Sequence, residues 1–275
     1  MKTIEQLKQT PLVICDIDNT LVEKHHDMSE RAIAAYHGLK KKGILFGLAS
    51  GRGIKQLRAL ADRWHLRCDL IIGMNGSELY DGILNQSEVF YDMKAQWLKE
   101  CFAIMAPFST KPHLVRDGVF YVRANDETVR SSSAYAKNGT DTCFVEDDAQ
   151  FWAGDAPKVG FRVRAEDIKQ IEAHVAKFPS PHYIGFKTEN TMFEFCNIHA
   201  SKGRLLRVFC ERHQIDLQTV CAFGDMSNDV SMLQEAGYGI CMRNGSPDAK
   251  EAATWITEKS VTEDGWADFV ERYLL

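Results

Sequence analysis

The sequence lacks any uninterrupted apolar run of 18 residues, and its first ten residues lack the apolar core of a secretory signal. We therefore expect no membrane partner and predict a cytoplasmic protein. A surplus of basic residues is also absent, because 33 Lys and Arg stand against 38 Asp and Glu, which gives a formal net charge of -5. This balance offers no general electrostatic footprint for nucleic acid, so we predict no nucleic-acid partner.

Cys-x-x-Cys pairs are absent as well, although the chain contains eight cysteines. Disulfides and a metal cluster are the alternatives that such a number raises, but most of these cysteines lie in apolar surroundings. We therefore expect reduced thiols in the protein core. The chain has 275 residues, of which 45% are hydrophobic and 26% charged, and it shows no internal repeat. These values are typical of a soluble globular protein with one or two domains.

A short apolar run at residues 13–15 ends in two carboxylates, Asp16 and Asp18, followed by Asn19 and Thr20. The run is rich in β-branched residues and predicts a buried strand. In an open parallel sheet, ligands bind outside the carboxyl ends of the strands. The two aspartates therefore mark a candidate site for metal-dependent phosphoryl transfer.

The pattern of apolar runs predicts an α/β fold with a Rossmann-like parallel sheet. Helices expected at residues 30–42 and 54–64 alternate with strands, and strand-helix-strand units imply parallel neighbours. From residue 82 the alternation changes, which predicts an inserted α+β cap at 82–187 within a core formed by 1–81 and 188–275. We expect the cap to form a small sheet with two helices on one face. The remaining core strands are expected at 44–49, 70–73, 192–196, 219–223, 239–241 and 255–256.

Polar groups follow four separate elements of the predicted core. Of the first pair, Asp16 suits a nucleophile that attacks phosphorus, and Asp18 suits an acid and base that protonates the leaving oxygen and then activates water. The transferring group carries charge on its equatorial oxygens and needs fixed donors around it. Suitable donors are Ser50, Gly51, Lys202 and Asn228.

An anionic phosphate beside carboxylates needs a cation, and oxygen ligands are what Mg²⁺ prefers. Asp16, Asp225 and a backbone carbonyl near Asp18 are the predicted ligands. Asp229 lies on the same loop as Asp225, and two roles stay open for it: binding the metal through water, or orienting Lys202.

These motifs together resemble those of the haloacid dehalogenase superfamily. The matching stretches are Asp16-Ile17-Asp18-Asn19-Thr20, Ser50-Gly51-Arg52, Lys202-Gly203 and Gly224-Asp225-Met226-Ser227-Asn228-Asp229. The turn at 75–76 and the position of the insert further resemble the Cof-like phosphatases.

The resemblance implies Asp16 as nucleophile and Asp18 as acid and base and as a metal ligand through its carbonyl. It also implies Asp225 as a metal ligand, with phosphate contacts at Ser50 and Lys202; Ile17 is a further predicted phosphate contact. Where this chain has Asn19, the family more often has Gly, and we expect no loss of activity because Asn tolerates unusual turn angles.

Alternation along three expected cap strands suggests a substrate-binding face. If the apolar residues of these strands pack against the helices of the cap, the opposite face of the sheet is basic and aromatic. This face would roof the active site and hold the leaving group, although an ordinary solvated sheet face is the alternative. Its predicted members are Tyr121, Arg123, Arg162, Arg164, Tyr183 and Lys187.

The function predicted from these residues is a Mg²⁺-dependent phosphatase acting on a small soluble phosphomonoester. A phosphotransferase or mutase of the same chemistry is the nearest alternative. A signalling receiver also uses acidic residues, an aspartyl-phosphate and a lysine, but it needs neither Asp18 nor a long insert. A silent phospho-ligand-binding protein is the third alternative, and the intact carboxylates argue against it.

Overall fold

The computed structural model describes residues 4–24, 26–124 and 141–275. The chain forms two compact units, one made of the residues up to Glu88 together with Ser201–Leu275, the other of Val89–Ala200. Part of the predicted insert, residues 125–140, lies outside the described residues. Within the described part, no helix is both long and apolar enough to span a membrane.

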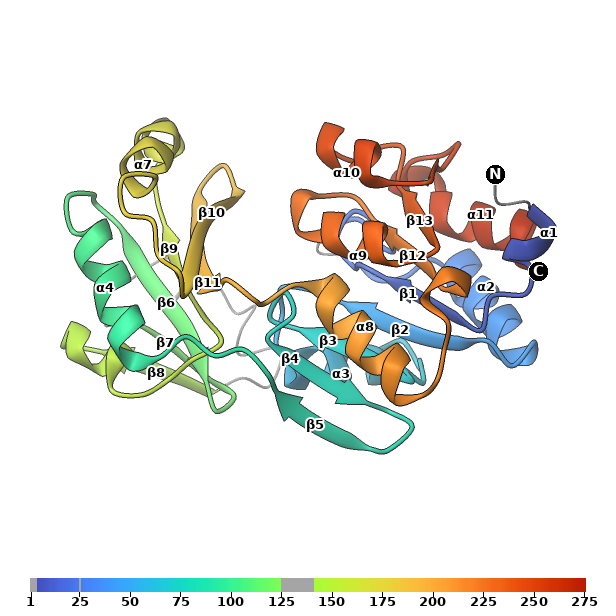
Figure 1. Cartoon of the computed structure of the whole chain (residues 1–275), viewed down its shortest axis with the longest axis horizontal. Coiled ribbons are helices and arrows are strands. Elements are labelled where there is room, and N and C mark those ends of the chain that lie inside the picture. The colour runs from blue at the N-terminus through green and yellow to red at the C-terminus, as the bar shows by residue number, and fades with distance from the viewer. Residues whose placement is uncertain (1–3, 25, 125–140) are drawn as a thin grey trace. The chain divides into compact units, whose positions relative to one another are not determined.

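The first unit is built on an eight-stranded sheet, whose order is β14-β13-β12-β1-β2-β3-β4-β5 (Figure 1). The six strands from β14 to β3 are parallel, and β4 returns antiparallel to β3. The parallel α/β core predicted from the sequence is therefore confirmed. The strands are β1 Leu12–Cys15, β2 Leu45–Ala49, β3 Leu70–Gly73, β4 Glu78–Asp81, β5 Gln86–Val89, β12 Cys221–Gly224, β13 Tyr238–Cys241 and β14 Trp255–Ile256.

The helices of this unit begin and end close to the predicted residues. Ser29 caps the second helix, since its side chain accepts a hydrogen bond from the Ala32 amide, and Gly43 follows the helix with a φ of 78°. Such a positive φ suits glycine, which has no Cβ to clash. The helices are α1 Ile4–Leu7, α2 Glu30–Lys41, α3 Ile54–Arg63, α8 Lys202–Arg212, α9 Val230–Glu235, α10 Pro247–Ala252 and α11 Gly265–Tyr273.

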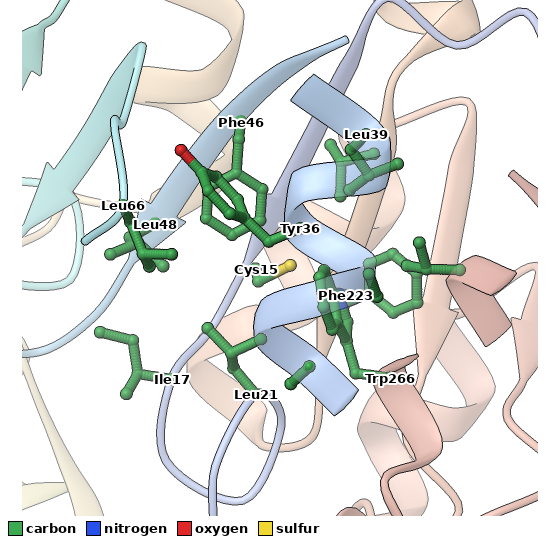
Figure 2. Close-up of a cluster of buried hydrophobic side chains, with 14 of the residues drawn as sticks. Cys15, Ile17, Leu21, Tyr36, Leu39, Phe46, Leu48, Leu66, Phe223 and Trp266 are labelled. Carbon is green, nitrogen blue, oxygen red and sulfur yellow. The ribbon is translucent and has the colours of Figure 1, made fainter. Parts of the chain in front are cut away.

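One large hydrophobic cluster of this unit lies on one face of the parallel sheet. Side chains of β1, β2 and β12 meet those of α2 and α11 there, with Phe46 and Phe223 both in edge contact with Trp266 (Figure 2). Cys15 belongs to this cluster, and alternation along the strand turns its neighbour Asp16 away from it. All eight cysteines are free thiols, as predicted.

The second unit is a six-stranded sheet of order β10-β11-β9-β6-β7-β8 with α4 and α7 packed on one face. Asp117 and Gly118, both with positive φ, form the hairpin turn between β6 and β7. Its elements are α4 Ala95–Met105, β6 Lys111–Arg116, β7 Val119–Arg123, β8 Asp141–Val145, β9 Lys158–Arg162, α7 Ile168–Val175, β10 Tyr183–Glu189 and β11 Met192–Asn197.

The structure corrects one strand assignment and both predicted boundaries of the insert. The run at 192–196 was expected in the parallel sheet, but as β11 it pairs antiparallel with β10 and β9. The run contains a charged residue, Glu194, whose carboxylate accepts a hydrogen bond from Lys158 on the neighbouring strand β9. This ion pair belongs to the second sheet and not to the parallel sheet. At the other end, β5 extends the first sheet, so the insert begins at Val89 and ends at Ala200 instead of spanning 82–187.

Candidate active site

Asp16 leaves β1 at the carboxyl end of the central parallel strands. Its backbone amide donates to the Phe223 carbonyl over 2.9 Å, which continues the pairing of β1 with β12 by one residue. The side chain is buried, and burial raises its pKa above the ordinary value; the Lys202 ammonium opposes this effect, and the Asp229 and Asp225 carboxylates reinforce it. The predicted nucleophile is thus held by the sheet itself.

Lys202 connects two of the predicted aspartates. Its fully buried Nζ donates to Asp16 Oδ1 and to Asp229 Oδ1, each over 2.6 Å. Burial alone would lower the pKa of this lysine, but attraction from the two carboxylates outweighs burial and raises it. Asp229 Oδ2 meanwhile accepts the amides of Asp225 and Met226. Both oxygens of Asp229 are therefore used within the protein, which supports its role in orienting Lys202.

The helix that carries Lys202 is fixed at both ends. Ser201 caps its first turn through the Arg204 amide, and a Cβ on Gly203 would lie 2.3 Å from the Ser231 carbonyl oxygen, so only glycine allows this approach to α9. At its far end, Arg212 and the following His213 both bind the buried Asp81 of β4. The helix that carries Lys202 is therefore held in place at both ends.

Asp225 follows β12 and faces the same site. Thr20 donates to its Oδ1 over 3.0 Å, and its own carbonyl accepts the Ser246 amide. Burial, followed by repulsion from Asp229, raises the pKa of Asp225 to about 7. The hydrogen bond to Asp225 Oδ1 comes from a neutral hydroxyl, whereas Asp16 and Asp229 accept from the Lys202 ammonium.

The carboxylates of Asp16, Asp225 and Asp229 bring one oxygen each to within 4.8 Å of one another, and all three are buried. Among the residues that the structure describes, the ammonium that contacts this group is that of Lys202, which binds Asp16 and Asp229. The excess negative charge in a buried, oxygen-lined site suits a hard divalent cation such as Mg²⁺. The carboxylate of Asp18 does not belong to this group of three possible metal ligands.

Asp18 projects instead toward the loop after β2. Arg52 Nη2 contacts both of its carboxylate oxygens, at 2.7 and 2.9 Å, and both side chains are partly exposed. The turn that follows contains Asn19 with a φ of 65°. This is the left-handed conformation that glycine or asparagine adopts with little strain, so the departure from Gly at this position fits the turn, as predicted.

Three loops meet around the predicted phosphate donors. The Ser50 carbonyl accepts the Asn75 amide, and Asn75 Oδ1 accepts Asn228 Nδ2 over 3.1 Å. Asn75 also lies against Gly51, where an added Cβ would be 3.3 Å from its oxygen. Ser50, Gly51 and Asn228 are therefore brought together as predicted. Ile17, whose side chain lies in the core, has only its backbone available for a ligand.

Sequence reasoning assigned no role to three residues that complete this geometry. They are Thr20, which binds Asp225, Arg52, which binds Asp18, and Asn75, which binds Asn228. Each of these residues lies within or beside a motif that was already noted, so the sequence indicated that it is near the site. The sequence did not indicate which residue it contacts, because contacts between loops far apart in sequence depend on the strand order.

The sequence model of one protein family, described as haloacid dehalogenase-like hydrolase, matches residues 13–270. The chain belongs to this family. A uracil-derivative phosphatase of Bacillus subtilis, 5-amino-6-(5-phospho-D-ribitylamino)uracil phosphatase YcsE, is 24% identical over 265 residues, covering 96% of both chains. The HMP-PP phosphatase of Yersinia pseudotuberculosis is 25% identical over 244 residues, covering 87% of this chain and 86% of its own.

Solved structures of the same family share the fold. A haloacid dehalogenase-like hydrolase from Bacteroides thetaiotaomicron superposes with a TM-score of 0.82 at 21% identity, covering 96% of this chain and 99% of its own. The fold of this chain therefore agrees with that structure over nearly its whole length.

The substrate face predicted on the second unit does not form as expected. Tyr121, Arg123 and Tyr183 lie on the helix-covered side of the sheet: Tyr121 packs against the cluster under α4, and Tyr183 donates to Glu100 of that helix over 3.1 Å. Arg123 binds Asp148 on the short helix that follows β8. Tyrosine is apolar enough to join a core when its hydroxyl finds a partner, which reverses the assumed orientation.

The three remaining members of that face are also separated. Lys187 pairs with Phe193 and so points to the helix-covered side, while Arg164 lies beyond β9 and binds Asp167. Only Arg162 of the six occupies the opposite side of the sheet, directly across from Met192. The prediction of a shared basic and aromatic face was therefore wrong.

Proposed function

We propose that this chain is a Mg²⁺-dependent phosphatase that hydrolyses a small phosphomonoester through an aspartyl-phosphate on Asp16. The observation that carries the proposal is the contact of Asp16 with Lys202, which Asp229 holds from its other side. A buried carboxylate fixed by an ammonium at the carboxyl edge of a parallel sheet is placed to attack phosphorus rather than to stabilise the fold.

In the first step, a carboxylate oxygen of Asp16 forms a bond to phosphorus while the bond from phosphorus to the ester oxygen breaks. Lys202, the Ser50 hydroxyl, the Gly51 amide and the Asn228 amide bind the phosphoryl oxygens. Asn75 holds one side of the Asn228 amide and leaves its second N–H for the phosphate. Asp18 gives its proton to the leaving oxygen.

In the second step, Asp18 takes a proton from water as the water attacks the phosphoenzyme. The bond between Asp16 and phosphorus breaks, inorganic phosphate leaves, and both carboxylates return to their initial state. Asp16, Asp225 and the Asp18 carbonyl would hold the Mg²⁺, which supplies positive charge that offsets repulsion between the phosphate and the aspartates.

The substrate class rests on supporting observations from the relatives. Both relatives named above are phosphatases of small phosphorylated metabolites by name. The acidic net charge of this chain argues against a nucleic-acid substrate.

The test is phosphate release from a panel of glucose 6-phosphate, ribose 5-phosphate, AMP, pyridoxal 5-phosphate, FMN and p-nitrophenyl phosphate, with Mg²⁺ and with chelator. We expect turnover with Mg²⁺ only, and at least a 10³-fold loss in Asp16→Asn, an order-of-magnitude value for a covalent nucleophile. Asp62→Asn, an exposed carboxylate of α3, is the matched control.

Asp18→Asn is expected to accumulate a phosphoenzyme, which mass spectrometry of the denatured protein detects. Full activity of Asp16→Asn would contradict the nucleophile. Product that appears on an added sugar hydroxyl instead of as free phosphate would favour the phosphotransferase, and a long-lived phospho-Asp16 without turnover in the wild type would favour the receiver.

A further inference from the structure

The contact between Arg52 and Asp18 has no role in the steps described above. Arg52 Nη2 lies 2.7 Å from Asp18 Oδ1 and 2.9 Å from Oδ2, so one N–H-bearing nitrogen spans both carboxylate oxygens. Among the described residues, Arg52 is the polar group to which the Asp18 carboxylate is bonded. The side chain of Asp18 is 28% exposed and lies outside the buried group of Asp16, Asp225 and Asp229.

The backbone amide and carbonyl of Arg52 both have hydrogen-bond partners. Its amide donates to Ser50 Oγ, and its carbonyl accepts the Met74 amide over 2.9 Å. The next residue, Gly53, is the N-cap of α3 and packs against Met74, where an added Cβ would be 2.9 Å from the Met74 methyl group. The guanidinium therefore extends toward Asp18 from a base that is tied to both β2 and β3.

We propose that Arg52 is a positioning residue that holds the Asp18 carboxyl in reach of the leaving oxygen, and this inference rests on the proposed function. An acid and base must lie within hydrogen-bond distance of the atom it protonates, and a displacement of about 1 Å can cost roughly 100-fold in rate. Asp18 has two rotatable bonds and one fixed partner. Removal of that partner leaves the carboxyl chemically intact but misplaced.

A positioning role for Asp18 makes a distinctive kinetic prediction, because substrates differ in their need for an acid. An alkyl phosphate expels an alkoxide that must be protonated, whereas p-nitrophenyl phosphate expels a phenolate that is stable in water. The parameter kcat/KM reports formation of the phosphoenzyme, in which Asp18 acts as acid; kcat also contains its breakdown, in which Asp18 acts as base.

The experiment compares wild type, Arg52→Met, Arg52→Lys and Asp18→Asn on p-nitrophenyl phosphate and on the fastest alkyl phosphate of the panel. For Arg52→Met we expect kcat/KM on the alkyl ester to fall by about 100-fold. On p-nitrophenyl phosphate we expect kcat/KM to stay within about threefold of wild type, while kcat and KM fall together because breakdown becomes slower. Arg52→Lys should recover part of the loss, since an ammonium can still bind one carboxylate oxygen.

Two controls separate this role from a general one. Arg58→Met removes an exposed arginine of α3 that stacks on Tyr80, and it should leave both esters unaffected. Arg52→Met combined with Asp18→Asn should lose no more than Asp18→Asn alone, because the two residues act as one unit.

An equal loss on both esters would overturn the inference and assign Arg52 to phosphate binding or to loop structure, and so would an unchanged alkyl reaction. In either case, wild-type turnover that Asp16→Asn abolishes would leave the proposed function standing. Absence of Mg²⁺-dependent turnover in the wild type would contradict both.

Discussion

Replacement of Lys202 by methionine tests the electrostatics of the site without any substrate. The change keeps the length and the apolar stem of the side chain and removes the ammonium that binds Asp16 and Asp229. Three buried carboxylates within 4.8 Å then have no cation. Removal of one partner from a buried ion pair costs about 3–5 kcal/mol, and we expect a loss of free energy of unfolding in that range for the metal-free protein.

The measurement is urea unfolding in chelator at pH 8, with hydrogen exchange of the β1 and β12 amides to follow the unit that contains the site. The midpoint should fall by roughly 1–2 M urea. The deficit should shrink toward pH 5, because burial holds the pKa values of Asp16 and Asp225 above their ordinary range and protonation removes the repulsion. Added Mg²⁺ should also reduce the deficit, by mass action on the folded state.

The matched control is Lys55→Met, an exposed lysine of α3 for which we expect a change within about 0.5 kcal/mol. A Lys202→Met protein as stable as wild type in chelator at pH 8 would refute the idea that the ammonium compensates a buried negative cluster. A deficit that grows toward pH 5 would refute it as well.

Two further predictions concern stability. Gly76→Ala should destabilise the protein by more than about 2 kcal/mol, because Gly76 has a φ of 103° and an added Cβ would lie 2.2 Å from the Ser201 carbonyl. Gly43→Ala is the control: Gly43 has a φ of 78° but an added Cβ would have nothing within 4 Å, so this change should cost only about 1 kcal/mol. Equal losses of stability in thermal melts of the two variants would contradict the steric argument. Burial lowers the pKa of His113 from 6.5 to about 4, so the folded protein binds fewer protons than the unfolded chain between these values, and stability should fall by up to about 3 kcal/mol as the pH drops through that window. The fall in Tm from pH 7 to pH 4.5 should be smaller in His113→Phe than in wild type; an equal fall in both would exclude this histidine as its source.

The chemistry-bearing residues of the core were predictable because each lies next to an apolar strand of unmistakable pattern. Asp16 and Asp225 follow buried strands, and parallel strands in one sheet bring their carboxyl ends to one edge. The contacts that set the roles of these residues were not predictable in the same way. From the sequence, Asp229 could either bind a metal or orient Lys202. The choice between these roles needed the hydrogen bonds of both its carboxylate oxygens, which only the structure shows.

The second unit was less predictable because its strands carry apolar residues on both sides. Phe120 and Val122 are buried on the side of β7 opposite Tyr121, so alternation could not tell which side faces the helices. Met192–Asn197 has the same ambiguity, since a short apolar run suits a central strand of either sheet. Strand pairing, which depends on distant partners, decided both cases.

The place of β1 at the centre of its sheet has a consequence for synthesis on the ribosome. One neighbour, β2, follows within the same stretch of chain, but the other, β12, begins only at Cys221. Thr20, which follows β1, and Asp225, which follows β12, are hydrogen-bonded to each other but are separated by 205 positions in the sequence. At usual speeds of translation, about 10–40 s pass between the synthesis of these two residues. During that interval the edge of β1 and the carboxylate that follows it have no partner from the second half of the chain. This edge of β1 therefore stays unpaired until β12 has been made, and the carboxylates of the site can come together only after that point of synthesis.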